Sequence, residues 1–156
     1  MPDAGNDRNG RQLWSLVLPE EVNALSVATD TNDNVLITGG NSNSNNAYIT
    51  SMNSADGSLR WTVPIGTGSG EETGTSVTAD TDGNVFATGT TTGAVDGTNA
   101  GGNDGFLVKL NAETGEEEWR VQFGSAQDDK AYAVVATDRW VTWHWHAAAL
   151  LCWVVT

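Results

Sequence analysis

The chain has 156 residues, of which 20 are Asp or Glu and 7 are Lys or Arg, so its formal net charge is -13. A surface this acidic repels nucleic acid and anionic lipid, which argues against both as partners, and it suits divalent cations or an extracellular medium. The single cysteine, Cys152, excludes an intrachain disulfide and a cysteine-based zinc site.

The first third of the chain has the pattern of four consecutive strands. Residues 1–11 are polar, are predicted to be disordered, and lack the apolar core of a signal peptide. Residues 12–19 predict a short strand that ends at a proline. Residues 22–40 alternate apolar and polar side chains around an Asp/Asn turn, which is typical of a β-hairpin. A strand over 47–53, a turn over 54–57 and a strand over 59–65 that carries Trp61 complete the unit.

The same order of elements then returns. A hairpin is predicted over 75–89, a strand over 105–111, a turn over 112–115 and a strand that carries Trp119. Asp30, Asp80 and Asp138 are 50 and 58 residues apart, and the unequal spacing comes from the loop over 90–103, which is longer than its counterpart over 41–46. A four-stranded unit that repeats about every 50 residues is typical of a β-propeller blade.

We therefore predict an all-β fold of propeller-like antiparallel blades. A degenerate first blade covers 12–63, a second covers 64–123 and the start of a third covers 124–138. Because a closed ring needs about four blades or more, the chain alone should form an open arc with exposed edges, or pair with copies of itself. The tryptophan on each fourth strand is expected to fill the gap between adjacent blades.

These residues carry a resemblance to a known repeat. The strings SVTADTDGNVFATG, DGFLVKLN and EEEWRVQFG resemble the bacterial-type SBBP β-propeller repeat, over about residues 22–138. The resemblance is fullest in the second unit and partial in the first, where Asn32-Asp33-Asn34 stands in place of Asp82-Gly83-Asn84. It implies a propeller fold, usually in a surface or secreted protein, and no single activity.

The resemblance stops after Asp138. Residues 139–156 contain four of the seven tryptophans and no acidic residue, where another turn and strand are expected. We favour a frameshift or a mis-predicted exon as the explanation; a genuine apolar strand or anchor is the alternative, although the segment is short for a membrane span. His144 and His146 would share one side of a strand, but no third metal ligand accompanies them.

Two places in the second unit are candidate sites. Asp80, Asp82 and Asn84 alternate oxygen ligands as calcium loops do, but the flanks are strands and Thr91 stands where an EF-hand loop has its glutamate. We favour a hairpin turn in which the aspartates accept hydrogen bonds from backbone amides, with weak calcium binding as the alternative. The loop over 90–103 joins strands two and three, at the same end as the link 124–130. Its polar residues form the predicted partner face: Thr90, Asp96, Asn99 and Asn103.

No stretch has the spacing of a catalytic site, so we predict no catalytic residue and no cofactor. Ser76 and Ser125 lack the context of a nucleophile elbow, and the run Glu116 to Glu118 is expected to be a solvated face. The favoured function is a non-enzymatic binding or structural module of a surface or secreted protein, with a protein or carbohydrate ligand. The alternative is a fragment of a quinoprotein-like dehydrogenase, because AETG with Trp119 resembles the docking motif of pyrroloquinoline-quinone propellers, although no residues match their cofactor ligands.

Overall fold

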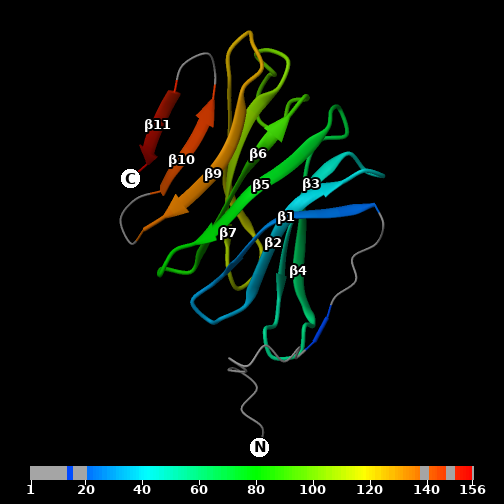
Figure 1. Ribbon diagram of the computed structural model, residues 1–156, viewed down its shortest axis with the longest axis vertical. Helices are drawn as coiled ribbons and strands as arrows, with labels where there is room; N and C mark the ends of the chain where they lie inside the picture. The colour runs from blue at the N-terminus through cyan, green and yellow to red at the C-terminus, as the bar shows by residue number, and fades with distance from the viewer. Residues whose placement is uncertain (1–13, 16–20, 138–140, 147–149, 156) are drawn as a thin grey trace, which may run out of the picture.

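The computed structural model describes residues 14–15 and 21–137, together with the backbone pairing of residues 141–146 and 150–155 (Figure 1). The segment 1–11 that we predicted to be disordered and most of the predicted strand over 12–19 lie outside the described residues, as do the side chains of His144, His146 and Cys152. Within the described part, no helix is present that is long and apolar enough to cross a membrane.

The described chain folds into three antiparallel sheets that follow one another in chain order. The first contains β1 (Val22–Thr29), β2 (Val35–Asn41), β3 (Asn46–Met52) and β4 (Leu59–Ile65). The second contains β5 (Glu72–Ala79), β6 (Asn84–Thr91), β7 (Asp104–Asn111) and β8 (Glu117–Phe123). The third contains β9 (Lys130–Ala136), β10 (Val141–His146) and β11 (Leu150–Val155). The predicted all-β fold of blade-like meanders is confirmed.

The hairpin turns form where aspartate and glycine make a tight reversal possible. Asp30 Oδ1 accepts hydrogen bonds from the backbone N–H of Asn32 (2.9 Å) and Asn34 (2.8 Å), which closes the β1–β2 turn. Asp33 has a φ of 61°, and Gly83, its counterpart between β5 and β6, has a φ of 85°. Glycine adopts this conformation at little cost, so the second turn is the less strained of the two.

A β-bulge in the first strand of each complete sheet links that sheet to its neighbour. The register of β1 with β2 shifts between Ala24 and Ser26, and that of β5 with β6 shifts between Gly74 and Ser76. Beyond each bulge a serine Oγ accepts a hydrogen bond across the junction: Ser26 from Val77 N and Ser76 from Val134 N, both at 3.2 Å. The innermost strands β1, β5 and β9 therefore lie side by side (Figure 1).

Apolar side chains fill both junctions between sheets. The larger cluster lies between the first and second sheets and includes Leu36, Ile49, Ile65, Val77, Val108 and Leu110. A smaller cluster of Phe86, Leu107 and Val134 packs with Trp119 and Phe123. The first sheet packs on the second and the second on the third, without closing a ring. Val27 on β1 (68% exposed) and Tyr132 on β9 (58% exposed) mark the open sides.

Tryptophan connects the first two sheets. Trp61 on β4 donates its indole N–H to the carbonyl of Ala112 (3.0 Å) and lies over Gly115, in the β7–β8 turn of the second sheet. Trp14 makes the same contact one unit earlier, with a hydrogen bond to the carbonyl of Ser54 (2.7 Å) and its ring over Gly57. Each ring therefore covers the turn of the next unit along the chain, and this places a bulky side chain in the gap between sheets.

The predicted boundary between the second hairpin and the long loop is wrong. The loop that we placed over 90–103 begins only at residue 92, because β6 continues through Thr90 and Thr91. These two residues pair with Gly105 and Asp104 of β7, and the hydroxyl of Thr91 is buried in a hydrogen bond to Glu72. Threonine favours a pleated, half-buried strand, so the ladder extends past Gly89, where we predicted its end.

Candidate functional site

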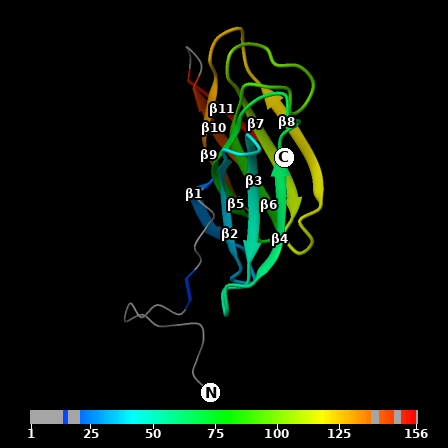
Figure 2. The ribbon, with the colours of Figure 1, turned by 90° about the vertical axis from the view of Figure 1, so that its right-hand side faces the viewer.

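The candidate site is the end of the blades that carries the long loop and the link to the third sheet. We call residues 92–103 the long loop and residues 124–129 the link; both lie at the upper end of the molecule in Figure 2. Asn103 donates hydrogen bonds from its backbone N (2.9 Å) and its side-chain Nδ2 (3.1 Å) to Asp128 Oδ1. The backbone N of Asp129 donates to the carbonyl of Asn103 (2.6 Å). Loop and link thus form one continuous surface, which we call the loop end.

The bond to Asn103 also sets the charge at this surface. Hydrogen bonds from the backbone and side chain of Asn103 lower the pKa of Asp128, and the positive charge of Lys130 acts in the same direction. The carboxylate of Asp128 therefore keeps its negative charge to a lower pH than an unperturbed aspartate does.

The four residues predicted as a partner face have different roles. Thr90 lies on β6, and Asp96 is exposed on the long loop. Asn99 holds the loop together, because its Nδ2 donates to the carbonyls of Thr92 (2.7 Å) and Gly102 (3.2 Å). Asn103 is used in the bonds to the link. Of the four, Asp96 is the one that presents an exposed side chain from the loop.

A glutamine that we did not predict as a site residue holds the long loop in place through hydrogen bonds. Gln122 on β8 accepts hydrogen bonds from the backbone N–H of Val95 (2.8 Å) and Asp96 (3.2 Å), and donates to the carbonyl of Gly93 (3.0 Å) and to Asp104 Oδ2 (2.8 Å). The corresponding residue of the first sheet is Pro64, next to a shorter loop. That difference between the two units is the signal by which Gln122 could have been found.

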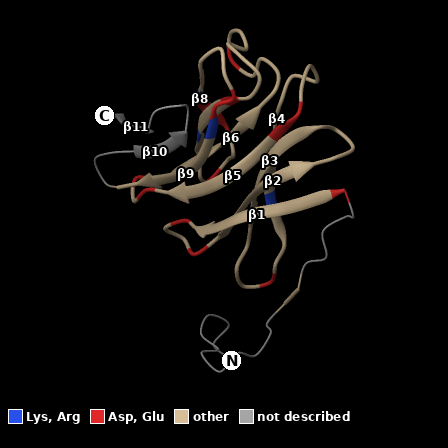
Figure 3. Ribbon diagram, turned by 45° about the horizontal axis from the view of Figure 1, so that its top comes forward, with Lys and Arg blue, Asp and Glu red and all other residues tan. Residues whose placement is uncertain are grey.

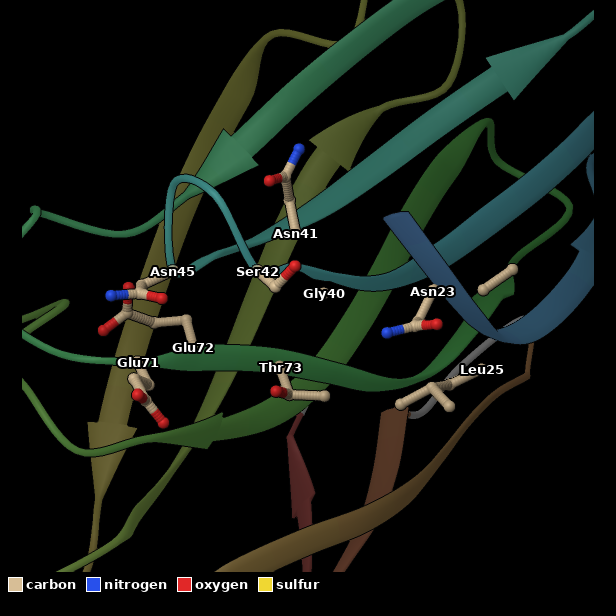
Figure 4. A pocket seen from close by; sticks show the side chains of 10 residues that line it. Asn23, Leu25, Gly40, Asn41, Ser42, Asn45, Glu71, Glu72 and Thr73 are labelled. Carbon is tan, nitrogen blue, oxygen red and sulfur yellow. The ribbon is translucent and has the colours of Figure 1, made fainter. Parts of the chain in front are cut away.

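A pocket of about 390 Å³ opens between the first and second sheets at the same end (Figure 4). Glu71, Glu72 and Asn45 gather at one side of it, and Asn23 and Leu25 lie at the other. Glu72 is 2% exposed and accepts a hydrogen bond from the hydroxyl of Thr91 at 2.8 Å. Burial raises the pKa of Glu72, because the low-dielectric surroundings disfavour the charged form more than the bond from Thr91 stabilises it.

The residues considered for weak calcium binding lie at the opposite end, in the β5–β6 turn. Asp80 Oδ1 accepts from the backbone N–H of Asp82 (3.0 Å) and Asn84 (2.9 Å), and its Oδ2 accepts from Asn84 Nδ2 (2.6 Å). Asp30 has the same bonds in the first sheet, so the turn alone accounts for these side chains. Among the described residues, no group of three or more His, Cys, Asp or Glu side chains is placed to hold a metal.

Acidic side chains concentrate at turns and strand ends (Figure 3). Three of the cations on the sheets form ion pairs: Arg60 with Glu113 (2.7 Å), Lys109 with Glu118 (2.7 Å), and Arg120 with Glu117. Glu117 and Glu118 of the acidic run are thus neutralised on β8. The remaining carboxylates give the surface its negative character.

Comparison with known proteins identifies the repeat. Residues 61–95 match the sequence model of the beta-propeller repeat family, SBBP. The match runs from Trp61 on β4 through β5 and β6 to Val95, so it includes the junction between the first two sheets. No curated protein matches the chain. The resemblance drawn from the sequence is confirmed over these residues: the chain contains an SBBP-type repeat, which is a structural repeat rather than a mark of enzymatic activity.

Proposed function

We propose that this β-propeller module is non-enzymatic and uses its loop end to bind a protein or carbohydrate ligand, as part of a surface or secreted protein. The observation that carries the proposal is the set of hydrogen bonds that hold the long loop. Gln122 and Asn99 hold its backbone with the hydrogen bonds described above. Asp96 and Thr98 are exposed on the same loop.

A fixed loop is a favourable binding element because little conformational entropy is lost when a ligand arrives. Propeller loops at one end of the blades are also free to vary without disturbing the packed sheets. The acidic loop end favours ligands that are neutral or basic, and it opposes binding to nucleic acid.

The test is a comparison of matched variants on arrays of immobilised glycans and peptides. The double variant Asp96→Ala, Thr98→Ala changes exposed side chains of the long loop and should lose binding. Asp82→Ala removes an exposed carboxylate at the opposite end and should retain it. Equal binding by both variants to every ligand found for the natural chain would place the binding surface elsewhere.

One observation favours the second candidate function, a fragment of a quinoprotein-like dehydrogenase. The turn AETG, which resembles that docking motif, is in contact with a tryptophan, although the ring is Trp61 of the preceding unit rather than Trp119. This contact concerns packing and supplies no group for redox chemistry. Alcohol oxidation by the chain after addition of pyrroloquinoline quinone and calcium would favour the dehydrogenase over a binding module.

A further inference from the structure

Four buried side-chain oxygens of the described residues have no hydrogen-bond partner: Asn46 Oδ1, Glu72 Oε2, Asp104 Oδ1 and Asp129 Oδ1. They are not scattered through the fold. One pair lies at the junction between the first and second sheets, and the other pair lies at the junction between the second and third. An unsatisfied buried oxygen is destabilising, so a pattern that occurs at both junctions calls for a physical explanation.

The two pairs occupy equivalent positions. Asn46 begins β3 and Asp104 begins β7, while Glu72 begins β5 and Asp129 immediately precedes β9. The same backbone hydrogen bond joins one member of each pair to the residue that precedes the other: Glu72 N donates to the carbonyl of Asn45 (2.7 Å), and Asp129 N donates to the carbonyl of Asn103 (2.6 Å). The repeat therefore builds this arrangement twice.

A glycine leaves room for the oxygens at each junction. A methyl group at Gly66 would lie 2.2 Å from Asn46 Oδ1 and 2.4 Å from Glu72 Oε2, so both oxygens face one small space. A methyl group at Gly124, the equivalent position, would lie 2.2 Å from Asp104 Oδ1. A larger residue would therefore fill the space in front of Asn46 Oδ1 and Glu72 Oε2 at the first junction, and in front of Asp104 Oδ1 at the second.

The chemistry of the two junctions differs. At the first, rotation of the Asn46 amide would turn its NH₂ group toward Glu72, so the protein has a donor of its own. At the second, Asp104 and Asp129 are both acceptors when ionised, and they are 1% and 0% exposed. Their Oδ2 atoms are already used: that of Asp104 by Ala100 N and Gln122, and that of Asp129 by Ser125 N and Oγ.

Within the described residues, neither Asp104 nor Asp129 forms an ion pair with Lys or Arg. Two buried carboxylates without a compensating positive charge are strongly unfavourable, because the interior screens their charges poorly. A small, hard cation removes this penalty, since calcium and magnesium take carboxylate, carbonyl and water oxygens as ligands.

We propose that the second junction binds a divalent cation of the calcium type through Asp104 Oδ1 and Asp129 Oδ1, with main-chain carbonyls of the link and water as further ligands. The ion would tie the long loop, which Asp104 anchors through Ala100 N, to the link that carries Asp129. This site is distinct from the β5–β6 turn of Asp80, and it does not depend on the proposed ligand of the loop end.

The test measures calcium binding by the whole chain after removal of metals with a chelator. We expect isothermal titration to give one site, and millimolar calcium to raise the melting temperature by about 4 °C, as binding to the folded state alone requires. Asp104→Asn and Asp129→Asn should each lose the heat of binding and the shift. Asp80→Asn, in the turn, and Glu72→Gln, at the first junction, should retain both.

Several results would overturn the proposal. One is the absence of heat and of a thermal shift in the natural chain. Another is calcium binding that survives both junction variants or disappears in Asp80→Asn. Because an altered junction can fail to fold, manganese is added to the natural chain as a paramagnetic probe. Amide signals of residues 99–104 and 124–129 should broaden first; broadening first at residues 80–84 would assign the ion to the turn.

Discussion

The contact between Trp61 and Gly115 offers the sharpest test of how adjacent sheets are held together. Gly115 has a φ of 74°, which places it in the left-handed region that other residues avoid. A methyl group there would lie 2.7 Å from Cδ2 and 2.9 Å from Cγ of the Trp61 indole, well inside normal contact. The substitution Gly115→Ala therefore strains the backbone and also pushes the indole away from its position.

The two costs can be separated with a matched position. Gly83 also has a positive φ, 85°, but a methyl group there would meet no atom within 4 Å. Gly83→Ala should reduce the free energy of unfolding by about 1 kcal/mol, the cost of the left-handed backbone alone. Gly115→Ala should add an overpacking cost of about 1 to 3 kcal/mol to that value.

Urea unfolding of both variants, followed by circular dichroism, gives the two free energies. The same glycine change is then made in a Trp61→Ala background, where the obstacle is gone and Gly115→Ala should cost no more than Gly83→Ala. Equal costs for the two glycine variants in the natural background would refute the reasoning, because they would mean that the indole gives way freely. The docked tryptophan would then contribute little to the cohesion of the sheets.

Three further outcomes are expected. Glu72→Gln should stabilise the chain by about 1 to 3 kcal/mol at neutral pH, because it replaces a buried carboxylate with a neutral amide that still accepts from Thr91. The pKa of Glu72 is raised in the folded state, so the stability that its protonated form gives is lost as pH rises through that pKa. The advantage of the variant in urea unfolding should therefore grow over this pH interval. It should be absent below the ordinary pKa of glutamate. Asp33→Gly should increase the free energy of unfolding by up to about 1 kcal/mol, because it relieves a positive φ at an exposed turn. Calorimetry should show this as a higher melting temperature, and no rise would indicate that Asp33 makes a compensating contact. Gln122→Ala should lower the melting temperature, because the buried groups that it contacts lose a partner, and should speed proteolytic cleavage within the long loop, since it removes the bonds to Val95 and Gly93; unchanged cleavage would show that Gln122 does not hold the loop.

The sequence predicted the local architecture well. Alternating side chains and Asp-Gly or Asp-Asn turns specify each hairpin within a few residues, so β1 to β8 appear where the pattern places them. The role of tryptophan also follows from size and position, since Trp61 does fill the gap between sheets. The end of β6 was missed because Thr90 and Thr91 continue a ladder whose partner strand begins at Asp104, beyond the loop.

What the sequence did not reveal are contacts between distant residues. Gln122 holds a loop that is more than 20 residues earlier in the chain, and Asp104 faces a junction completed only by Asp129. Neither is adjacent to a recognisable motif, so no local pattern marks them. Aligning the two units would have drawn attention to both, because Pro64 corresponds to Gln122 and Asn46 to Asp104.

The contacts between sheets also determine the order in which the chain can fold during synthesis. Among the described residues, the bonds between sheets run between consecutive units, from Ser26 to Val77, from Ser76 to Val134 and from Trp61 to the turn at Ala112. A nascent chain can therefore complete its first meander, dock the second as it leaves the ribosome, and use that surface to receive the third. Each described sheet needs only the next sheet in the chain to cover its apolar face. This limits the time during which that face is exposed.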